Sequence, residues 1–231
     1  MTLAPHQFWQ TLDAPQTHSV DPEAGFSDFY PAELPDGRQL CLPIRVLPGD
    51  GESAVASLIV NQASFVVEDA LAAAMADKAK EFAPDVIVGV PTLGLPLANN
   101  VARLLGHSRM VALGTSRKFW YRDELSEPMS SITSPQHAKR IFVDPRMLPL
   151  LEGKKVVVVD DVLSSGTSMA AVLRLLRGAG IEPVAVIAAM LQGTKWRDTL
   201  VELDADLPEW VFGAIASPRL RKSESGCWLP E

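Results

Sequence analysis

The chain has 231 residues, a length that suits one domain or one domain with an elaborated edge. Hydrophobic residues make up 47% and charged residues 21%, which excludes a disordered chain, a collagen and a coiled coil as overall descriptions. The net charge of −7 disfavours binding to nucleic acid or to an anionic membrane, but a small phosphorylated ligand needs only a few local donors and stays open.

The N-terminal sequence and the cysteine content favour a cytoplasmic protein. The chain starts without a basic segment followed by an apolar one, so we expect no secretory signal. No apolar run approaches the roughly 20 residues of a membrane span. Cys41 and Cys227 are too few for a disulfide framework and are typical of reduced thiols.

Residues 1–65 predict an irregular arm followed by a hairpin. The first 37 residues show weak periodicity, with a short helix expected around Phe8–Leu12. Two apolar runs, 38–47 and 54–60, then flank Pro48-Gly49-Asp50-Gly51, which is typical of a β-hairpin.

From residue 66 onward, helices and strands alternate. Apolar residues at near-helical spacing predict a helix that begins near residue 66 and stops before Pro84. A buried strand over 86–90, a helix over 95–105 that closes at Gly106, and a strand over 110–113 follow.

Residues 114–140 lack clean periodicity. An irregular stretch of this length in a compact domain is uncommon and is typical of a lid or of a disordered segment. We therefore expect residues 119–138 to be mobile without ligand.

The second half continues the alternation. We expect a strand over 156–159 that is covered on both faces, a helix over 167–177 and a strand over 183–191. The tail from 192 contains an expected edge strand around 210–216. Alternating strands and helices predict an α/β fold with a mainly parallel, doubly wound sheet.

The segment from Val156 to Ser168 carries the most chemical information. It combines a buried strand, the acid pair Asp160 and Asp161, a small hydroxyl-rich turn and a helix start. Ligands of open α/β sheets bind beyond the carboxyl ends of strands, and N–H groups at a helix N-terminus bind phosphate. The acid pair can accept hydrogen bonds from a ribose diol or hold a divalent cation through water. The competing interpretation is a solvated acid pair followed by an ordinary helix cap.

This segment closely resembles the phosphoribosyl-pyrophosphate (PRPP) signature of type I phosphoribosyltransferases. The resemblance implies that Asp160 and Asp161 bind the ribose hydroxyls of PRPP, act as the catalytic pair and hold Mg²⁺ indirectly, through water and PRPP. It assigns the 5′-phosphate to the loop that follows. The residues of that loop are Ser164, Ser165, Gly166, Thr167 and Ser168.

Two further segments are similar to the family. Residues 86–98 resemble its first core strand and pyrophosphate loop, and 116–121 resemble the Arg-Lys segment of adenine and xanthine phosphoribosyltransferases. The pyrophosphate residues implied by these matches are Pro91, Thr92, Leu93, Gly94, Arg117 and Lys118. An isolated Arg-Lys pair is more often a solvated surface pair.

The resemblance covers residues 66–191 and implies a domain organisation. Residues 66–191 would form the PRPP-binding core, with 114–140 in the place of the family's catalytic loop. Residues 1–65 and 192–231 would build a smaller hood over it. The resemblance assigns no individual role to the side chains on or beside the loop, which are Trp120, Tyr121, Glu124, Glu127, His137, Lys139 and Arg140. Aromatic residues of the chain ends are candidates for stacking on a base, or simply pack the hood; they are Phe26, Phe29, Tyr30, Trp196, Trp210 and Trp228.

The chain departs from the family at three positions. Ser164 stands where 6-oxopurine enzymes have an assisting Asp, which disfavours a hypoxanthine-guanine enzyme. Adenine enzymes have a loop Glu near the position of Thr133, and an Arg in the pyrophosphate loop where this chain has Leu93. The match to the adenine enzymes is therefore one of layout.

The resemblance implies a Mg²⁺-dependent transfer of 5-phosphoribosyl from PRPP to a purine-like nucleobase with release of pyrophosphate, carried out by a homodimer. One alternative is a PRPP-sensing regulator without catalysis, although residues 1–65 show no helix-turn-helix pattern or basic stripe. Another is a protein of this fold in which a different acceptor replaces the base.

Overall fold

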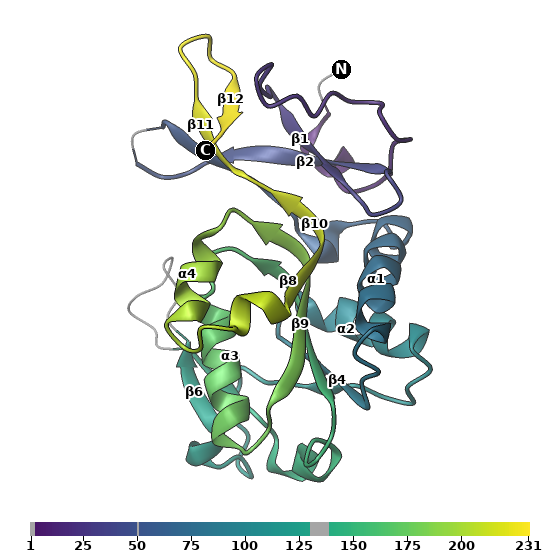
Figure 1. The fold of residues 1–231 in the computed structure, drawn as a ribbon, viewed down its shortest axis with the longest axis vertical. Coiled ribbons are helices and arrows are strands. Elements are labelled where there is room, and N and C mark those ends of the chain that lie inside the picture. The colour runs from purple at the N-terminus through teal and green to yellow at the C-terminus, as the bar shows by residue number, and fades with distance from the viewer. Residues whose placement is uncertain (1–2, 50, 130–138) are drawn as a thin grey trace.

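The computed structural model describes residues 3–49, 51–129 and 139–231, and two five-stranded sheets organise it (Figure 1). The larger body is built on a five-stranded parallel sheet in the order β10-β9-β8-β4-β5. Its strands are β4 (Val86–Gly89), β5 (Val111–Ala112), β8 (Val156–Leu163), β9 (Pro183–Gln192) and β10 (Val211–Ser217). All five fall on or beside the predicted strands.

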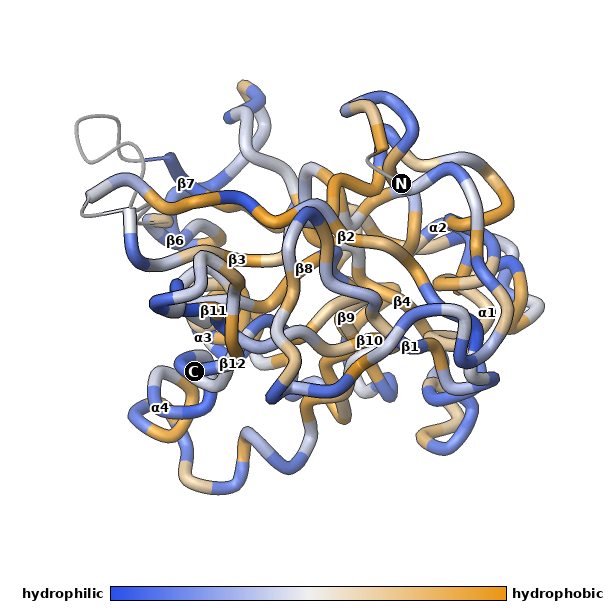
Figure 2. The backbone as a smooth tube through the Cα atoms, turned by 90° about the horizontal axis from the view of Figure 1, so that it is seen from above, coloured by the Kyte–Doolittle hydropathy of each residue, from blue (hydrophilic) through white to orange (hydrophobic). Residues whose placement is uncertain are grey.

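Helices cover both faces of this sheet, as the unbroken apolar runs of its strands predict. The helices α1 (Phe65–Lys80) and α2 (Gly94–Leu104) lie on one side, and α3 (Thr167–Gly178) and α4 (Lys195–Val201) on the other (Figure 1). Val157 and Val159 of β8 are buried with α1 and α2, while Val156 and Val158 are buried with α3. Figure 2 shows the hydrophobic residues gathered along the central strands and many of the hydrophilic ones on the outer loops.

A second, antiparallel sheet, here called the hood, lies across one end of the parallel sheet (Figure 1). Its strands, in sheet order, are β1 (Phe29–Glu33), β2 (Gln39–Val46), β3 (Ser53–Ala56), β11 (Arg219–Lys222) and β12 (Trp228–Pro230). The predicted hairpin is the β2–β3 pair. The expected α/β fold with a smaller hood from the chain ends is confirmed, whereas β1, α4, β11 and β12 were not foreseen.

The N-terminal arm differs from its prediction. A 3₁₀ turn at Pro5–Gln7 replaces the helix expected around Phe8–Leu12. Trp9 adopts a left-handed φ of 62°, which a helix cannot continue, and its buried indole donates a hydrogen bond to the Ser57 carbonyl at 2.9 Å. The burial of Trp9 therefore decides the local backbone. The other 3₁₀ turns are Val60–Gln62, Asp123–Leu125, Pro145–Leu150 and Leu207–Trp210.

The segment 114–140 is more regular than expected. Strands β6 (Ser126–Met129) and β7 (Lys139–Phe142) pair as an antiparallel ribbon, and Gly114 bridges to Phe142. The Arg140 guanidinium donates to Ser126 Oγ at 2.8 Å, and Ile141 is buried. Contacts with the core therefore order a stretch that has no periodicity of its own. Residues 130–138, with Thr133 and His137, lie outside the described residues, so the predicted mobility there is untested.

In the described part of the chain, no helix has both the length and the apolar character needed to cross a membrane.

Candidate active site

The acid pair lies within strand β8 rather than after it. Strand β4 ends at Gly89, opposite Val159, and the Val90 amide donates to the Val159 carbonyl at 2.9 Å. Beyond this point β8 continues to Leu163 because β9 still pairs with it on the other side. The segment Asp160–Leu163 therefore leaves its β4-side edge to the loop that follows β4.

The Asp160 carboxyl group is held away from water, and Asp161 beside it is half-buried. The Asp160 residue is 7% exposed, and its Oδ1 accepts the Asp161 backbone N–H at 2.8 Å. Burial raises the pKa of Asp160 well above its ordinary value, and the adjacent Asp161 carboxylate raises it further. Burial also raises the pKa of Asp161. Among the described residues neither acid pairs with a basic side chain, so a bound cation or hydroxyl donor would relieve this charge.

The turn after β8 is shaped by a glycine and supported by α4. Gly166 has a φ of +80°, and a Cβ there would lie 3.0 Å from Cα and O of Trp196. The Thr199 hydroxyl donates to the Ser165 carbonyl at 2.7 Å. Helix α4 therefore holds the turn from which α3 begins at Thr167.

A pocket of about 130 Å³ opens between the acid and this turn. It is lined by Asp160, Val162, Leu163, Ser164, Ser165, Gly166, Ser168 and Met169. The first-turn N–H groups of α3 and the serine hydroxyls suit an anion. The structure thus brings one acid and most of the predicted phosphate loop into one cavity, which Asp161 and Thr167 do not line.

The loop from Pro91 to Gly94 lies against the acid pair. A Cβ on Gly94 would stand 2.9 Å from both Cα and Oδ1 of Asp160, so only glycine fits where α2 begins. The Pro91–Thr92 peptide is cis, and Leu93 precedes the first residue of α2. The predicted pyrophosphate loop and the acid pair are therefore in contact.

The two predicted basic residues stand apart from the described pocket. Arg117 forms an exposed ion pair with Asp123 at 2.6 Å, and neither Arg117 nor Lys118 lines the cavity. The neighbouring Trp120 indole donates to Asp144 at 3.2 Å, and the Arg146 guanidinium stacks on its ring at 4.3 Å. A pyrophosphate role for Arg117 and Lys118 stays a prediction.

The aromatic candidates divide by burial. Phe26, Trp196 and Trp228 are buried and pack the interior, and Trp210 is 48% exposed at the end of the 3₁₀ turn Leu207–Trp210. Phe29 packs edge-on against His18. Tyr30 alone of the six lines the second cavity described next.

A larger cavity, here called the hood pocket, was not foreseen from the sequence. It has a volume of about 570 Å³ and is lined by Tyr30, Lys195, Asp198, Arg219, Glu231 and the chain around Gly193 and Ser217. Arg219 Nε is buried and makes no hydrogen bond among the described residues, with the Glu231 carboxylate 3.9 Å away. These residues come from β1, the turn after β9, α4, β10, β11 and the C-terminus, and no local motif links them.

Comparisons with known proteins identify the family to which this chain is similar. A family model described as phosphoribosyl transferase domain matches residues 59–214. The chain is 33% identical over 126 residues to a bifunctional protein PyrR of Leifsonia xyli, covering 51% of this chain and 63% of that protein. It is 34% identical over 126 residues to an adenine phosphoribosyltransferase of Rhodococcus jostii, covering 54% of this chain and 64% of that one.

A solved structure shares the fold. It is the adenine phosphoribosyltransferase of Saccharomyces cerevisiae, with a TM-score of 0.55 and 18% identity, covering 75% of this chain and 93% of that one. The chain spans less than two thirds of the length of the two curated relatives named above.

Proposed function

The chain belongs to the phosphoribosyl transferase domain family, and from this premise we propose that it is an enzyme that transfers 5-phosphoribosyl from PRPP to a purine-like nucleobase and releases pyrophosphate. The observation that carries the proposal is the pocket between Asp160 and the N-terminus of α3, where an acid meets a phosphate-binding turn. A sugar phosphate with a free diol matches both halves of this cavity.

We assign the ends of PRPP to the two sides of the acid pair. The 5′-phosphate would lie in the turn Ser164–Ser168, and Asp160 and Asp161 would accept hydrogen bonds from the ribose hydroxyls. The pyrophosphate would lie toward Pro91–Gly94, whose last residue touches Asp160. Arg117 and Lys118 would approach it from the loop after β5. The protein's main task is then placement and charge neutralisation.

The donor set at the acid pair fits Mg²⁺. Two carboxyl groups that have no basic partner in the described part of the chain offer the oxygen ligands that this ion prefers, held through water and PRPP. Bound there, Mg²⁺ would stabilise the charge of the departing pyrophosphate.

We assign the acceptor to the hood pocket. Strands β8, β9 and β10 are adjacent and parallel, so their carboxyl ends lie at one edge of the sheet, about 5 Å apart per strand. The hood pocket follows β9 and β10 at that edge. Tyr30 offers a ring to stack on a base, and Arg219 Nε and Lys195 offer hydrogen-bond donors.

A binding experiment tests the PRPP site. Titration calorimetry with PRPP and Mg²⁺ should show binding to the wild-type protein and none to Asp160→Asn/Asp161→Asn. The control Asp77→Asn/Glu81→Gln makes the same charge change on two exposed residues, one in α1 and one directly after it, and should bind like wild type. Retained affinity in the first variant, with the fold intact by circular dichroism, would refute the assignment.

A second candidate is a regulator that binds PRPP without catalysis, because the relatives include a protein named bifunctional as well as an adenine phosphoribosyltransferase. An assay of pyrophosphate release with a panel of nucleobases separates the two. We expect turnover with at least one base, reduced in Arg219→Ala through a higher KM for the base. PRPP binding without turnover on any base would favour the regulator.

The proposed enzyme works as a homodimer in the cytoplasm, a proposal drawn from the family resemblance and the cysteine content. Analytical ultracentrifugation of the full chain tests the oligomeric state.

A further inference from the structure

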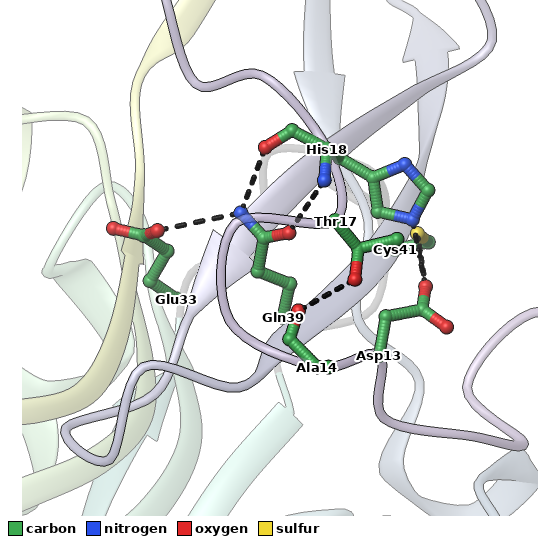
Figure 3. Close-up of polar contacts among 7 residues, drawn as sticks. All are labelled: Asp13, Ala14, Thr17, His18, Glu33, Gln39 and Cys41. Carbon is green, nitrogen blue, oxygen red and sulfur yellow. Dashed lines mark hydrogen bonds and ion pairs between the residues drawn. The ribbon is translucent and has the colours of Figure 1, made fainter.

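Three side chains of different chemistry meet in the N-terminal part of the chain, outside the matched family domain. Asp13, His18 and Cys41 place a carboxylate oxygen, a ring nitrogen and a sulfur within 4.8 Å of one another. His18 Nε2 lies 2.7 Å from Asp13 Oδ2, and the Cys41 thiol donates to the same oxygen at 3.4 Å. Figure 3 shows the imidazole and the sulfur together on one side of the Asp13 carboxylate.

A buried glutamine holds the three residues in place. Gln39 is fully buried, and its backbone exchanges two hydrogen bonds with Asp13, at 2.8 and 2.9 Å. Its side-chain amide accepts from the His18 N–H at 2.8 Å and donates to the His18 carbonyl at 3.0 Å (Figure 3). Cys41 is two residues farther along β2 and so points to the same face of the strand. The cluster is thus fixed by the sheet rather than by a flexible loop.

The cluster borders a cavity of about 270 Å³. Besides the three side chains, the cavity is lined by Leu3, Gln7, Trp9, Thr11, Thr17 and Phe29. The side chains of His18 and Asp13 are 28% and 37% exposed, while the Cys41 residue is 7% exposed. The site is therefore sheltered on the sulfur side and open on the other, with room for a further ligand such as water.

The hydrogen bonds of Cys41 differ from those of a nucleophilic cysteine. A catalytic thiol gives its proton to a base such as His, which is held in turn by a third group. Here the thiol donates to Asp13, and Asp13 is the residue shared by the other two. A carboxylate oxygen that contacts both a sulfur and an imidazole nitrogen is instead typical of side chains that converge on a metal ion.

We propose that Asp13, His18 and Cys41 bind one zinc ion and leave its fourth position to water. Zn²⁺ takes thiolate, imidazole and carboxylate ligands together, whereas Mg²⁺ and Ca²⁺ avoid sulfur. In a tetrahedral zinc site such ligand atoms stand about 3.3–3.6 Å apart. The sulfur–oxygen distance already fits, and the nitrogen–oxygen pair must open by about 0.6 Å on the same geometry.

Zinc binding would release the thiol proton of Cys41 and replace the two hydrogen bonds to Asp13 by bonds to the metal. The ion would join the arm at Asp13 and His18 to strand β2 at Cys41. The site would therefore fasten the N-terminal arm to the hood, and it uses none of the residues assigned to PRPP.

The test uses the full chain, stripped of metal and kept reduced. Titration with Zn²⁺ against a chromophoric chelator should give one equivalent bound per chain and a higher melting temperature. Co²⁺ in place of Zn²⁺ should produce a thiolate-to-cobalt charge-transfer band together with the visible bands of a tetrahedral ion.

Variants identify the ligands. Cys41→Ser should abolish the charge-transfer band and weaken zinc binding by at least about 100-fold, since loss of an outer-sphere partner alone costs 10–100-fold. His18→Gln should weaken binding similarly. The matched controls Cys227→Ser and His107→Gln, which alter a cysteine and a histidine outside the cluster, should bind as wild type does.

Two outcomes would overturn the proposal: no stoichiometric zinc binding by the wild-type chain, or equal loss in Cys41→Ser and Cys227→Ser. Circular dichroism confirms that each variant is folded. PRPP binding, measured in parallel, should be unchanged in Cys41→Ser, so failure of this proposal and failure of the proposed function are separate results.

Discussion

The ionised form of Asp160 destabilises the fold of the unliganded protein. Its carboxyl group is buried beside a second acid, and both burial and that neighbour raise its pKa above the ordinary value near 3.8. A side chain that only supported the fold would be better uncharged at this place. The cost makes sense if a ligand that brings hydroxyl donors and a cation occupies the site.

The pH dependence of stability tests this cost. The folded-state pKa of Asp160 lies above its unfolded value. The favourable contribution of the protonated carboxyl group to the free energy of unfolding is therefore complete below about pH 3.9, and it is lost as the pH rises through the raised pKa. Asp160→Asn removes the ionisation, so its melting temperature should exceed that of wild type by an amount that grows as the pH rises above about 3.9 and becomes constant once the raised pKa is passed.

Thermal unfolding of the ligand-free protein measures the difference. Asp77→Asn, an exposed site on α1, is the control and should show no such growth. A difference in melting temperature that stays constant with pH would contradict the raised pKa of Asp160.

Gly166 offers a second test at the scale of one residue. Gly166→Ala imposes a left-handed backbone on a residue with a Cβ, which costs about 1–2 kcal/mol of stability. It also places that Cβ 3.0 Å from the Trp196 backbone. The contact should cost about 1–3 kcal/mol more and displace the phosphate turn, which weakens PRPP binding.

Gly153→Ala isolates the conformational part of this cost. Its φ is +68° and a Cβ there meets nothing within 4 Å. Denaturant unfolding should show a smaller loss for Gly153→Ala than for Gly166→Ala, with PRPP affinity kept. Equal losses would mean that α4 does not support the turn.

Among the secondary-structure elements, α1 shows how the arm is attached to the core. Its cap, Ser64, accepts the Val67 N–H at 3.4 Å and donates its hydroxyl to the Gln10 carbonyl at 2.7 Å. The Ser64 N–H donates to the Trp9 carbonyl at 3.0 Å. One residue therefore both starts the helix and fastens the N-terminal arm.

Ser64→Ala should lower the free energy of unfolding by about 1–2 kcal/mol, because it removes a helix cap and leaves a carbonyl without its donor. The control Ser108→Ala alters an exposed serine and should change stability by less than about 0.5 kcal/mol. Denaturant unfolding measures both, and equal stabilities would show that the arm is held without Ser64.

For the molecule as a whole, the charge of −7 opposes binding to a polyanion. The described pocket is lined by an acid and by neutral residues, so the protein itself brings little positive charge to it. A divalent cation is the natural source of the missing charge.

Removing the metal should therefore weaken PRPP binding by at least about 10-fold. Calorimetric titrations with Mg²⁺ and with EDTA, at one ionic strength, provide the comparison. Equal affinities would mean that basic residues such as Arg117 and Lys118 supply the charge.

The sequence by itself determined the features that are local in the chain. The strands β4, β8 and β9, the helices α1 to α3 and the sequence of acid pair, turn and helix start each depend on neighbouring residues, so periodicity and a contiguous motif predict them. The family and its α/β fold followed from these, and both are confirmed.

Only the tertiary structure decided what depends on residues far apart in the chain. The hood joins Val55 to Arg219, and the hood pocket lies where those ends meet the core. The extension of β8 to Leu163 depends on pairing with β9. The need for glycine at position 94 comes from the close approach of Asp160. Asp13 and Cys41 meet only because the arm lies along β2. Packing between distant segments sets each of these, and such contacts leave no periodic signal in the sequence.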